Sequence, residues 1–251
     1  MTGPPSAAWM PRSIGSLAVA AGGLVLLAWA LDLETVKGPL QGAATMKVNT
    51  ALCFVLAGLA LATTSTRGVP SPVGSGLALA AVAIAVATLA EYAFSWNLHI
   101  DQLLAIDDGP ASSTPGRMSP VTALSFAALG TGMWASRTPG RLWLREPLAI
   151  VALLASAVAM LGYTYDTYAL YSVGPYTSMA PHTAGLMTLM SIGLLAQHPT
   201  GGGLSGIVLG PDLGGKTARR LLPWALATPM VVGWLKLQGQ RAGLWETEFG
   251  V

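Results

Sequence analysis

The chain has 251 residues, of which 53% are hydrophobic and only 10% are charged, and its formal net charge is +2. A soluble domain carries about 25% charged residues, so this chain has too few charges to cover a water-facing surface. The net charge is also too small for a nucleic-acid-binding protein. We therefore expect an all-α, polytopic membrane bundle whose main partner is the lipid bilayer.

The sequence predicts seven apolar helices of membrane length or slightly less. In chain order they cover residues 14–31, 48–64, 75–95, 121–136, 147–165, 183–197 and 221–237. The first also resembles a secretory signal peptide, because Arg12 precedes it and Ala28-Trp29-Ala30 has the form of a cleavage site. We favour a retained helix, since the apolar stretch is long for a signal peptide and forms a hairpin with the next helix.

A motif of the form M-x-x-x-T-A occurs three times, each time at the start of an apolar segment. Its copies are Met46-Lys-Val-Asn-Thr50-Ala51, Met118-Ser-Pro-Val-Thr122-Ala123 and Met179-Ala-Pro-His-Thr183-Ala184. Pro120 and Pro181 stand where a helix starts and needs no backbone N–H, and Ser119 is a candidate N-cap. We interpret the motif as a helix-start and packing device, with a ligand role for the threonines as the alternative.

Repetition of this motif predicts an internal repeat. Hairpins made by residues 14–64, 75–136 and 147–197 would form parallel repeats, and helix 221–237 would begin a fourth hairpin without its partner. Gly58 and Gly130 each follow a motif threonine by eight residues, so we expect close helix packing at both positions.

The distribution of Lys and Arg predicts the orientation of the chain in the membrane. Eight basic residues fall in one set of loops: Arg12, Arg67, Arg137, Arg141, Arg145, Lys216, Arg219 and Arg220. Five fall in the other set: Lys37, Lys47, Arg117, Lys236 and Arg241. We therefore expect a cytoplasmic tail over residues 1–13, extracytoplasmic M-x-x-x-T-A motifs, and an extracytoplasmic segment 239–251 that ends at Val251.

Unusual residues gather in the predicted extracytoplasmic layer. Glu91 is the one acid inside a predicted span, and it lies about 24 Å along its helix, where it is either an interfacial acid or a pocket residue. Five tyrosines between Tyr163 and Tyr176 form either an aromatic belt or a pocket wall. The candidate ligand-binding residues of this layer are Glu91, Tyr92, Trp96, His99, Asp101, Tyr163, Asp166, Tyr168 and His182.

The sequence contains no phosphate-binding loop, nucleophile elbow or zinc motif, so we expect no enzymatic activity in these residues. We predict no cofactor and no metal. A haem or quinone held by His99 and His182 is the alternative, although the histidine spacing does not suit stacked haems. The single cysteine, Cys53, lies in an apolar run and cannot form an internal disulfide.

Several segments resemble the N-terminal multi-helix membrane region of bacterial sensor histidine kinases and diguanylate cyclases. They are Met46-Lys-Val-Asn-Thr-Ala-Leu-Cys-Phe, Asp101-Gln-Leu-Leu, Pro115-Gly-Arg-Met-Ser-Pro-Val-Thr-Ala-Leu, Met179-Ala-Pro-His-Thr-Ala and Gly239-Gln-Arg-Ala-Gly-Leu-Trp-Glu-Thr-Glu-Phe-Gly. The resemblance covers residues 14 to 251 and implies a sensory input domain in the bacterial inner membrane.

In that family another membrane helix follows, and then come PAS and kinase or cyclase modules. The resemblance therefore implies that this chain is either the input part of a longer sensor or a free-standing relative. Such a relative would be a structural or cofactor-holding subunit of a membrane complex, or a homodimer. A small transporter is the third alternative, although the spans contain no acid–base pair at mid-depth.

Overall fold

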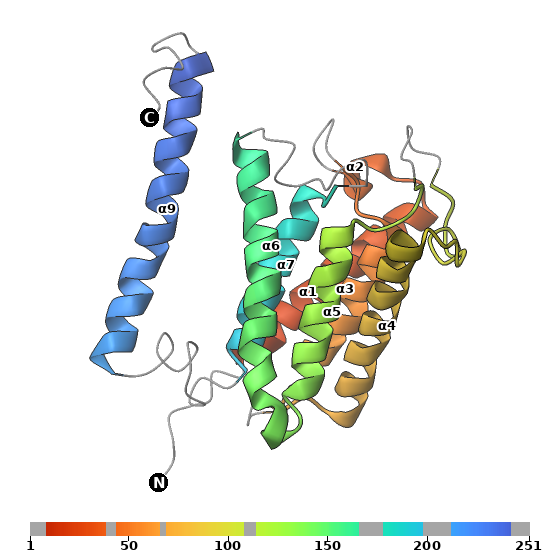
Figure 1. Cartoon of the computed structure of the whole chain (residues 1–251), viewed down its shortest axis with the longest axis horizontal. Helices are drawn as coiled ribbons and strands as arrows, with labels where there is room; N and C mark the ends of the chain where they lie inside the picture. Colours follow the sequence, from red (N-terminus) through yellow and green to blue (C-terminus); the bar gives the residue numbers. More distant parts are fainter. Residues whose placement is uncertain are drawn as a thin grey trace.

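The computed structural model describes residues 9–38, 44–65, 69–107, 114–165, 178–197 and 212–241, and every regular element within them is a helix (Figure 1). The elements are α1 (Trp9–Ala30), α2 (Glu34–Lys37), α3 (Val48–Ala62), α4 (Pro72–Phe94), α5 (Pro120–Ala135), the 3₁₀ helix η1 (Pro139–Leu144), α6 (Arg145–Tyr165), α7 (Pro181–Leu195) and α9 (Leu213–Arg241).

The seven predicted helices are all present, and within the described residues three segments are long and apolar enough to cross a membrane. These segments are Trp9–Ala30, Pro72–Phe94 and Pro139–Tyr165, the last of which joins η1 to α6. Helices α3, α5 and α7 have only 15, 16 and 15 residues. At about 1.5 Å per residue each is about 22–24 Å long, which is less than the hydrocarbon core of about 30 Å.

Helices α1 and α9 begin well before their predicted starts, because the first turn of each lies outside the apolar run on which the prediction was based. Helix α9 starts at Leu213 instead of residue 221, since Asp212 caps it by accepting a hydrogen bond from the backbone N–H of Gly215 at 3.1 Å. Helix α1 starts at Trp9, inside the predicted tail 1–13. The short helices α2 and η1 were not predicted, since neither has an apolar period.

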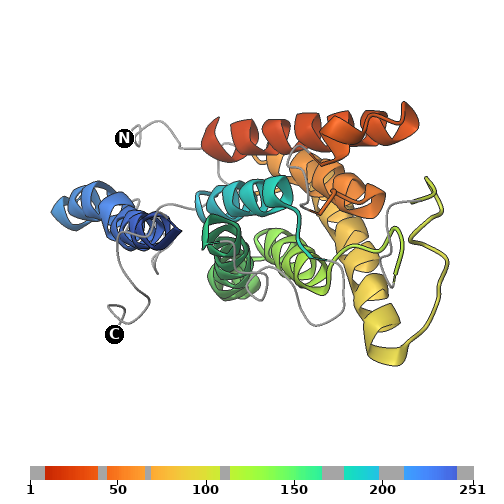
Figure 2. The same ribbon diagram turned by 90° about the horizontal axis from the view of Figure 1, so that it is seen from above.

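The long helices pack as neighbours in sequence: α1 against α3, α4 against α5, and α6 against α7. Helices α3, α5 and α7 also contact one another, so they form the centre of the bundle. Helices α1, α4 and α6 each touch two of these central helices, and α1 closes the ring by packing on α7 (Figure 2). Helix α9 stands beside the bundle, against α6.

Small residues let paired helices approach closely, as expected for Gly58 and Gly130. A Cβ atom on Gly58 would lie 2.8 Å from the carbonyl oxygen of Gly15, and one on Gly130 would lie 2.8 Å from that of Ala78. Both distances are shorter than a van der Waals contact. The α1–α3 and α4–α5 contacts therefore need glycine at these two places.

All three M-x-x-x-T-A motifs lie at one end of the bundle, which we name the MxxxTA end (Figure 1). In each hairpin an aromatic side chain in the last turn of the outer helix donates to the main-chain carbonyl of the motif methionine. These hydrogen bonds join Trp29 Nε1 to Met46 at 2.9 Å, Tyr92 Oη to Met118 at 3.0 Å and Tyr163 Oη to Met179 at 2.6 Å. The three methionines and the threonines Thr50, Thr122 and Thr183 are buried.

The expected helix starts are confirmed at two of the motifs. Pro120 and Pro181 are the first residues of α5 and α7, where a missing N–H costs nothing. The Ser119 side chain caps α5 by accepting from the backbone N–H of Thr122 at 3.1 Å. The motif therefore acts as a helix-start device in the way its composition predicts.

The centre of the bundle is apolar over three successive layers of completely buried side chains. Each layer takes one residue from each central helix: Phe54, Phe126 and Met187; Ala57, Leu129 and Met190; Leu61, Met133 and Leu194. The rings of Phe54 and Phe126 meet edge to face at 4.8 Å. Helices α3, α5 and α7 thus bury their apolar residues in protein, which fits their short length.

We expect Gly58→Ala to lower the stability of the bundle by about 1–3 kcal/mol, because the added methyl group forces α1 and α3 apart. Gly23→Ala on α1 is the matched control, since no atom lies within 4 Å of its Cβ position. Thermal unfolding of both variants in detergent micelles measures the difference. Equal unfolding midpoints of the two variants would show that the close contact at Gly58 does not contribute to the stability of the bundle.

Candidate functional site

The predicted site residues fall on two hairpins. Glu91 and Tyr92 lie in the last turn of α4, and Trp96, His99 and Asp101 follow in the connection to α5. Tyr163 is in α6 and His182 in α7, at the same end of the bundle. Asp166 and Tyr168 lie outside the described residues.

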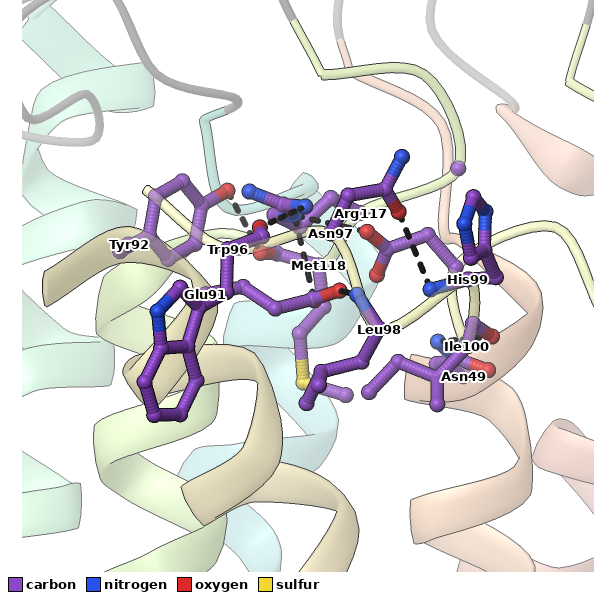
Figure 3. A network of polar contacts seen from close by, with 12 residues as sticks. Asn49, Glu91, Tyr92, Trp96, Asn97, Leu98, His99, Ile100, Arg117 and Met118 are labelled. Carbon is purple, nitrogen blue, oxygen red and sulfur yellow. Dashed lines mark hydrogen bonds and ion pairs between the residues drawn. The ribbon is translucent and has the colours of Figure 1, made fainter. Parts of the chain in front are cut away.

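A buried ionic cluster, which we name the Arg117 network, joins Glu91, Asp101 and Arg117. Figure 3 shows Glu91 and Arg117 beside the backbone that follows α4. The Arg117 Nε atom donates to Asp101 Oδ2 at 2.7 Å and lies 3.3 Å from Glu91 Oε2. Glu91 Oε1 accepts from the backbone N–H of Leu98 at 2.8 Å. The Glu91 side chain is completely buried, and those of Asp101 and Arg117 are each only 9% exposed.

This network contains two carboxylates and one guanidinium. Glu91 Oε2 and Asp101 Oδ1 are both buried, and neither accepts a hydrogen bond from any described residue. With both acids ionised, the network would hold one negative charge in excess. Removing charges from water is costly, so such a cluster is sensitive to any change that adds or removes a proton or moves the loop.

A second buried ion pair fastens the same loop to the neighbouring hairpin. Lys47 Nζ lies 2.6 Å from Asp107 Oδ2, which also accepts from the backbone N–H of Gly116 at 2.8 Å. The Asn49 side chain donates to the carbonyl of Ile100 at 3.1 Å. The connection between α4 and α5 is therefore tied both to its own hairpin and to the start of α3.

Gly116 has a backbone conformation that this connection requires. Its φ is +73°, in the left-handed region, and a Cβ atom there would lie 2.5 Å from the carbonyl oxygen of Asp101. Glycine is the residue that accepts both constraints without strain. It places Arg117 directly beside Asp101.

Of the other predicted residues in α4 and this connection, only Tyr92 lies against the network with its side chain. Its ring centroid is 5.2 Å from the Arg117 guanidinium, which allows a cation–π contact. The Trp96 side chain is exposed and stacks on Phe94 at 4.8 Å, while its carbonyl lies 3.5 Å from Arg117 Nη2. His99 is exposed and has a φ of +57°.

The residues of the third hairpin have a different environment. The Tyr163 hydroxyl donates to the main-chain carbonyl of Met179 and so joins α6 to the start of α7. His182 is partly buried, and neither of its ring nitrogens has a hydrogen-bond partner among the described residues. The proposed haem or quinone ligands His99 and His182 thus stand on different hairpins. The described residues contain no group of three His, Cys, Asp or Glu side chains that could hold a metal ion.

A more exposed cluster closes the first hairpin. Lys37 Nζ lies 2.6 Å from Asp32 Oδ1 and 2.7 Å from Glu34 Oε1, over the ring of Trp29 at 4.4 Å. Burial alone would lower the pKa of Lys37, but the hydrogen bonds and charges of the two acids outweigh it and raise the pKa above 10.5. The stabilisation from this charge is therefore complete at neutral pH, and it is lost only as the pH rises through the raised pKa.

Arg117 is the residue of this network that the sequence interpretation missed. It was counted as a basic residue of the extracytoplasmic loops and as part of the segment from Pro115, but not as a site residue. The available signal was a lone arginine between an acid-rich loop and a helix start. A buried partner for Glu91 had to be sought among the few cations on the same side of the membrane.

We expect Arg117→Met to destabilise the bundle by about 3–5 kcal/mol, because it leaves two buried carboxylates without a cation. Arg141→Met is the matched control, since Arg141 is exposed and only stacks on Trp134. Adding Asp101→Asn to Arg117→Met should recover part of the loss, which thermal unfolding measures as a double-mutant cycle. Equal losses for the two arginine variants would contradict a buried ionic role.

The chain was compared with protein-family models, with curated proteins and with solved structures. No family model matches it, and no curated protein or solved structure is significantly similar to it.

Proposed function

We propose that this chain is the membrane-embedded sensory input domain of a bacterial signal-transduction protein. The observation that carries the proposal is the Arg117 network, a buried cluster of two carboxyl groups and one guanidinium under a loop that is tied to two hairpins. The resemblance of the sequence to sensor histidine kinases and diguanylate cyclases supports the same function. Structural stability alone does not require a buried ionic cluster, because apolar residues would serve as well.

We further propose that the chain crosses the inner membrane seven times as three and a half parallel hairpin repeats. The three aromatic-to-methionine hydrogen bonds support this repeat. Positions 1, 4, 7 and 11 residues before each aromatic donor are also buried in all three hairpins. They are Ala28, Val25, Gly22 and Ala18 in α1; Glu91, Thr88, Ala85 and Ala81 in α4; and Gly162, Ala159, Ser156 and Ala152 in α6.

Transport is the alternative that the packing supports least. The three apolar layers of α3, α5 and α7 fill the centre of the bundle with completely buried side chains. A transporter needs polar groups around a midplane site between its repeats. The polar cluster of this protein lies instead at one end of the bundle, where a signal from outside the cytoplasm would arrive.

The signal would act by changing the relative stability of two arrangements of the α4–α5 connection. A proton, an ion or a ligand that binds the Arg117 network in one arrangement better than in the other shifts the population between them. The closely packed α4 and α5 would carry the difference to the cytoplasmic end as a small helix shift.

We expect the gene to continue beyond codon 251 with an eighth membrane span, followed by PAS and kinase or cyclase motifs.

In that longer protein, Glu91→Gln should change the basal output because it removes one ionisable group of the Arg117 network. Asp32→Asn is the control, since the Asp32 side chain is 88% exposed at the same end. Autophosphorylation or cyclase activity in membranes is the readout. A stop codon after Val251 would favour the membrane-complex subunit, and an unchanged output of Glu91→Gln would remove the network from signalling.

Orientation has its own test. A cysteine at Glu34, whose side chain is 72% exposed at the MxxxTA end, should react with a membrane-impermeant maleimide in intact spheroplasts. A cysteine at Gly140, which has no atom within 4 Å of its Cβ position, should react only after lysis. The reverse pattern would place the MxxxTA end in the cytoplasm and contradict the proposed topology.

A further inference from the structure

The connection that carries Asp101 and Asp107 has an unusual surface. Between Phe94 and Ile106, six of its large apolar side chains are exposed: Phe94, Trp96, Leu98, Leu103, Leu104 and Ile106. Leu103 and Ile106 are 75% and 69% exposed. So much adjacent apolar surface is rare on a water-facing loop and marks a contact with a membrane or with another protein.

The acidic side chains of the same segment point into the protein, away from this apolar surface. Asp101 and Asp107 are its only charged residues, and both side chains are buried in ion pairs with Arg117 and Lys47. The other polar residues of the segment are Ser95, Asn97, Gln102 and the exposed His99. The exposed face of residues 94–107 therefore presents no acid, lysine or arginine, and inserting it among lipid headgroups with His99 neutral requires no ion to leave water.

This surface continues the apolar exposed side of α4. Leu79, Val86 and Phe94 are exposed at spacings of seven and eight residues, so they lie along one side of the helix. Phe94 stacks on Trp96, which extends the apolar surface into the loop. The segment runs on the outer side of the bundle, beyond α4 (Figures 1 and 2).

The depth of the segment follows from its backbone. It contains no regular helix, so many of its N–H and C=O groups need water or polar headgroups as partners and cannot enter the hydrocarbon core. The headgroup region satisfies both the polar backbone and the apolar side chains. Tryptophan is also enriched at that depth.

We propose that residues 94–107 lie in the headgroup region of the bilayer leaflet at the MxxxTA end and form a membrane-surface anchor. The occupant of the exposed apolar surface is phospholipid, not a second copy of the chain or another protein. The same segment carries Asp101 and Asp107, which pair with Arg117 and Lys47. A movement of its lipid-facing side would therefore also move the buried ion pairs. This inference depends on the membrane insertion of α4 and not on the sensory role of the protein.

The test labels single cysteines with the fluorophore NBD, in a Cys53→Ala background and in phosphatidylcholine–phosphatidylglycerol vesicles. The loop variants are Leu103→Cys and Ile106→Cys, at positions whose exposure lets the label replace the side chain without disturbing the core. Val86→Cys on the exposed side of α4 is the lipid control, and Glu34→Cys is the water control. Each sample is quenched by nitroxide lipids labelled at the headgroup or deep in the acyl chain, and by aqueous iodide.

The expected result is strong quenching of both loop labels by the headgroup nitroxide, with several-fold weaker iodide quenching than at Glu34→Cys. The label at Val86→Cys should be quenched best by the deep nitroxide. Iodide quenching equal to that of Glu34→Cys, without nitroxide quenching, would place the loop in water and overturn the proposal. Protection of the loop labels from all quenchers would show that protein covers them and would overturn it as well.

Discussion

Each outer–inner helix pair depends on satisfying one main-chain carbonyl where the chain leaves extended backbone and starts a helix, near the membrane boundary that we propose. Water is scarce at that depth, so a carbonyl without a donor is costly. Trp29, Tyr92 and Tyr163 supply the donor from the end of the preceding helix. An aromatic ring with a polar tip suits this boundary, and the bond closes the hairpin as it satisfies the carbonyl.

The three hairpins differ at the residue directly before the aromatic donor. Ala28 and Gly162 are small, whereas the equivalent residue of the second hairpin is Glu91, and all three are buried. A carboxylate in this place needs a cation, and Arg117 meets it from the start of the next helix. The function we propose lies in this departure from the proposed repeat, because the shared residues serve packing and hairpin closure.

Much of the fold could be predicted from the sequence because its signals are local. Apolar runs located all seven helices, and Pro120, Pro181 and Ser119 marked helix starts that the structure confirms. The site was predicted less well. Glu91 and Asp101 were named together, and Tyr92, which closes its hairpin, also lies against Arg117, but Arg117 itself was overlooked. Ion pairs between residues 26 positions apart, as for Glu91 and Arg117, leave no periodic signal in a sequence.

The positions of the helices, and the presence of segments apolar enough for a lipid bilayer, could be predicted from composition and local pattern alone. The contacts in space show in addition that α3, α5 and α7 are central, that Arg117 lies between Glu91 and Asp101, and that residues 94–107 turn their apolar side outward. The physical reason is that lipid and protein are equally apolar surroundings. A leucine facing either has the same sequence signature, so only its neighbours in space separate the two.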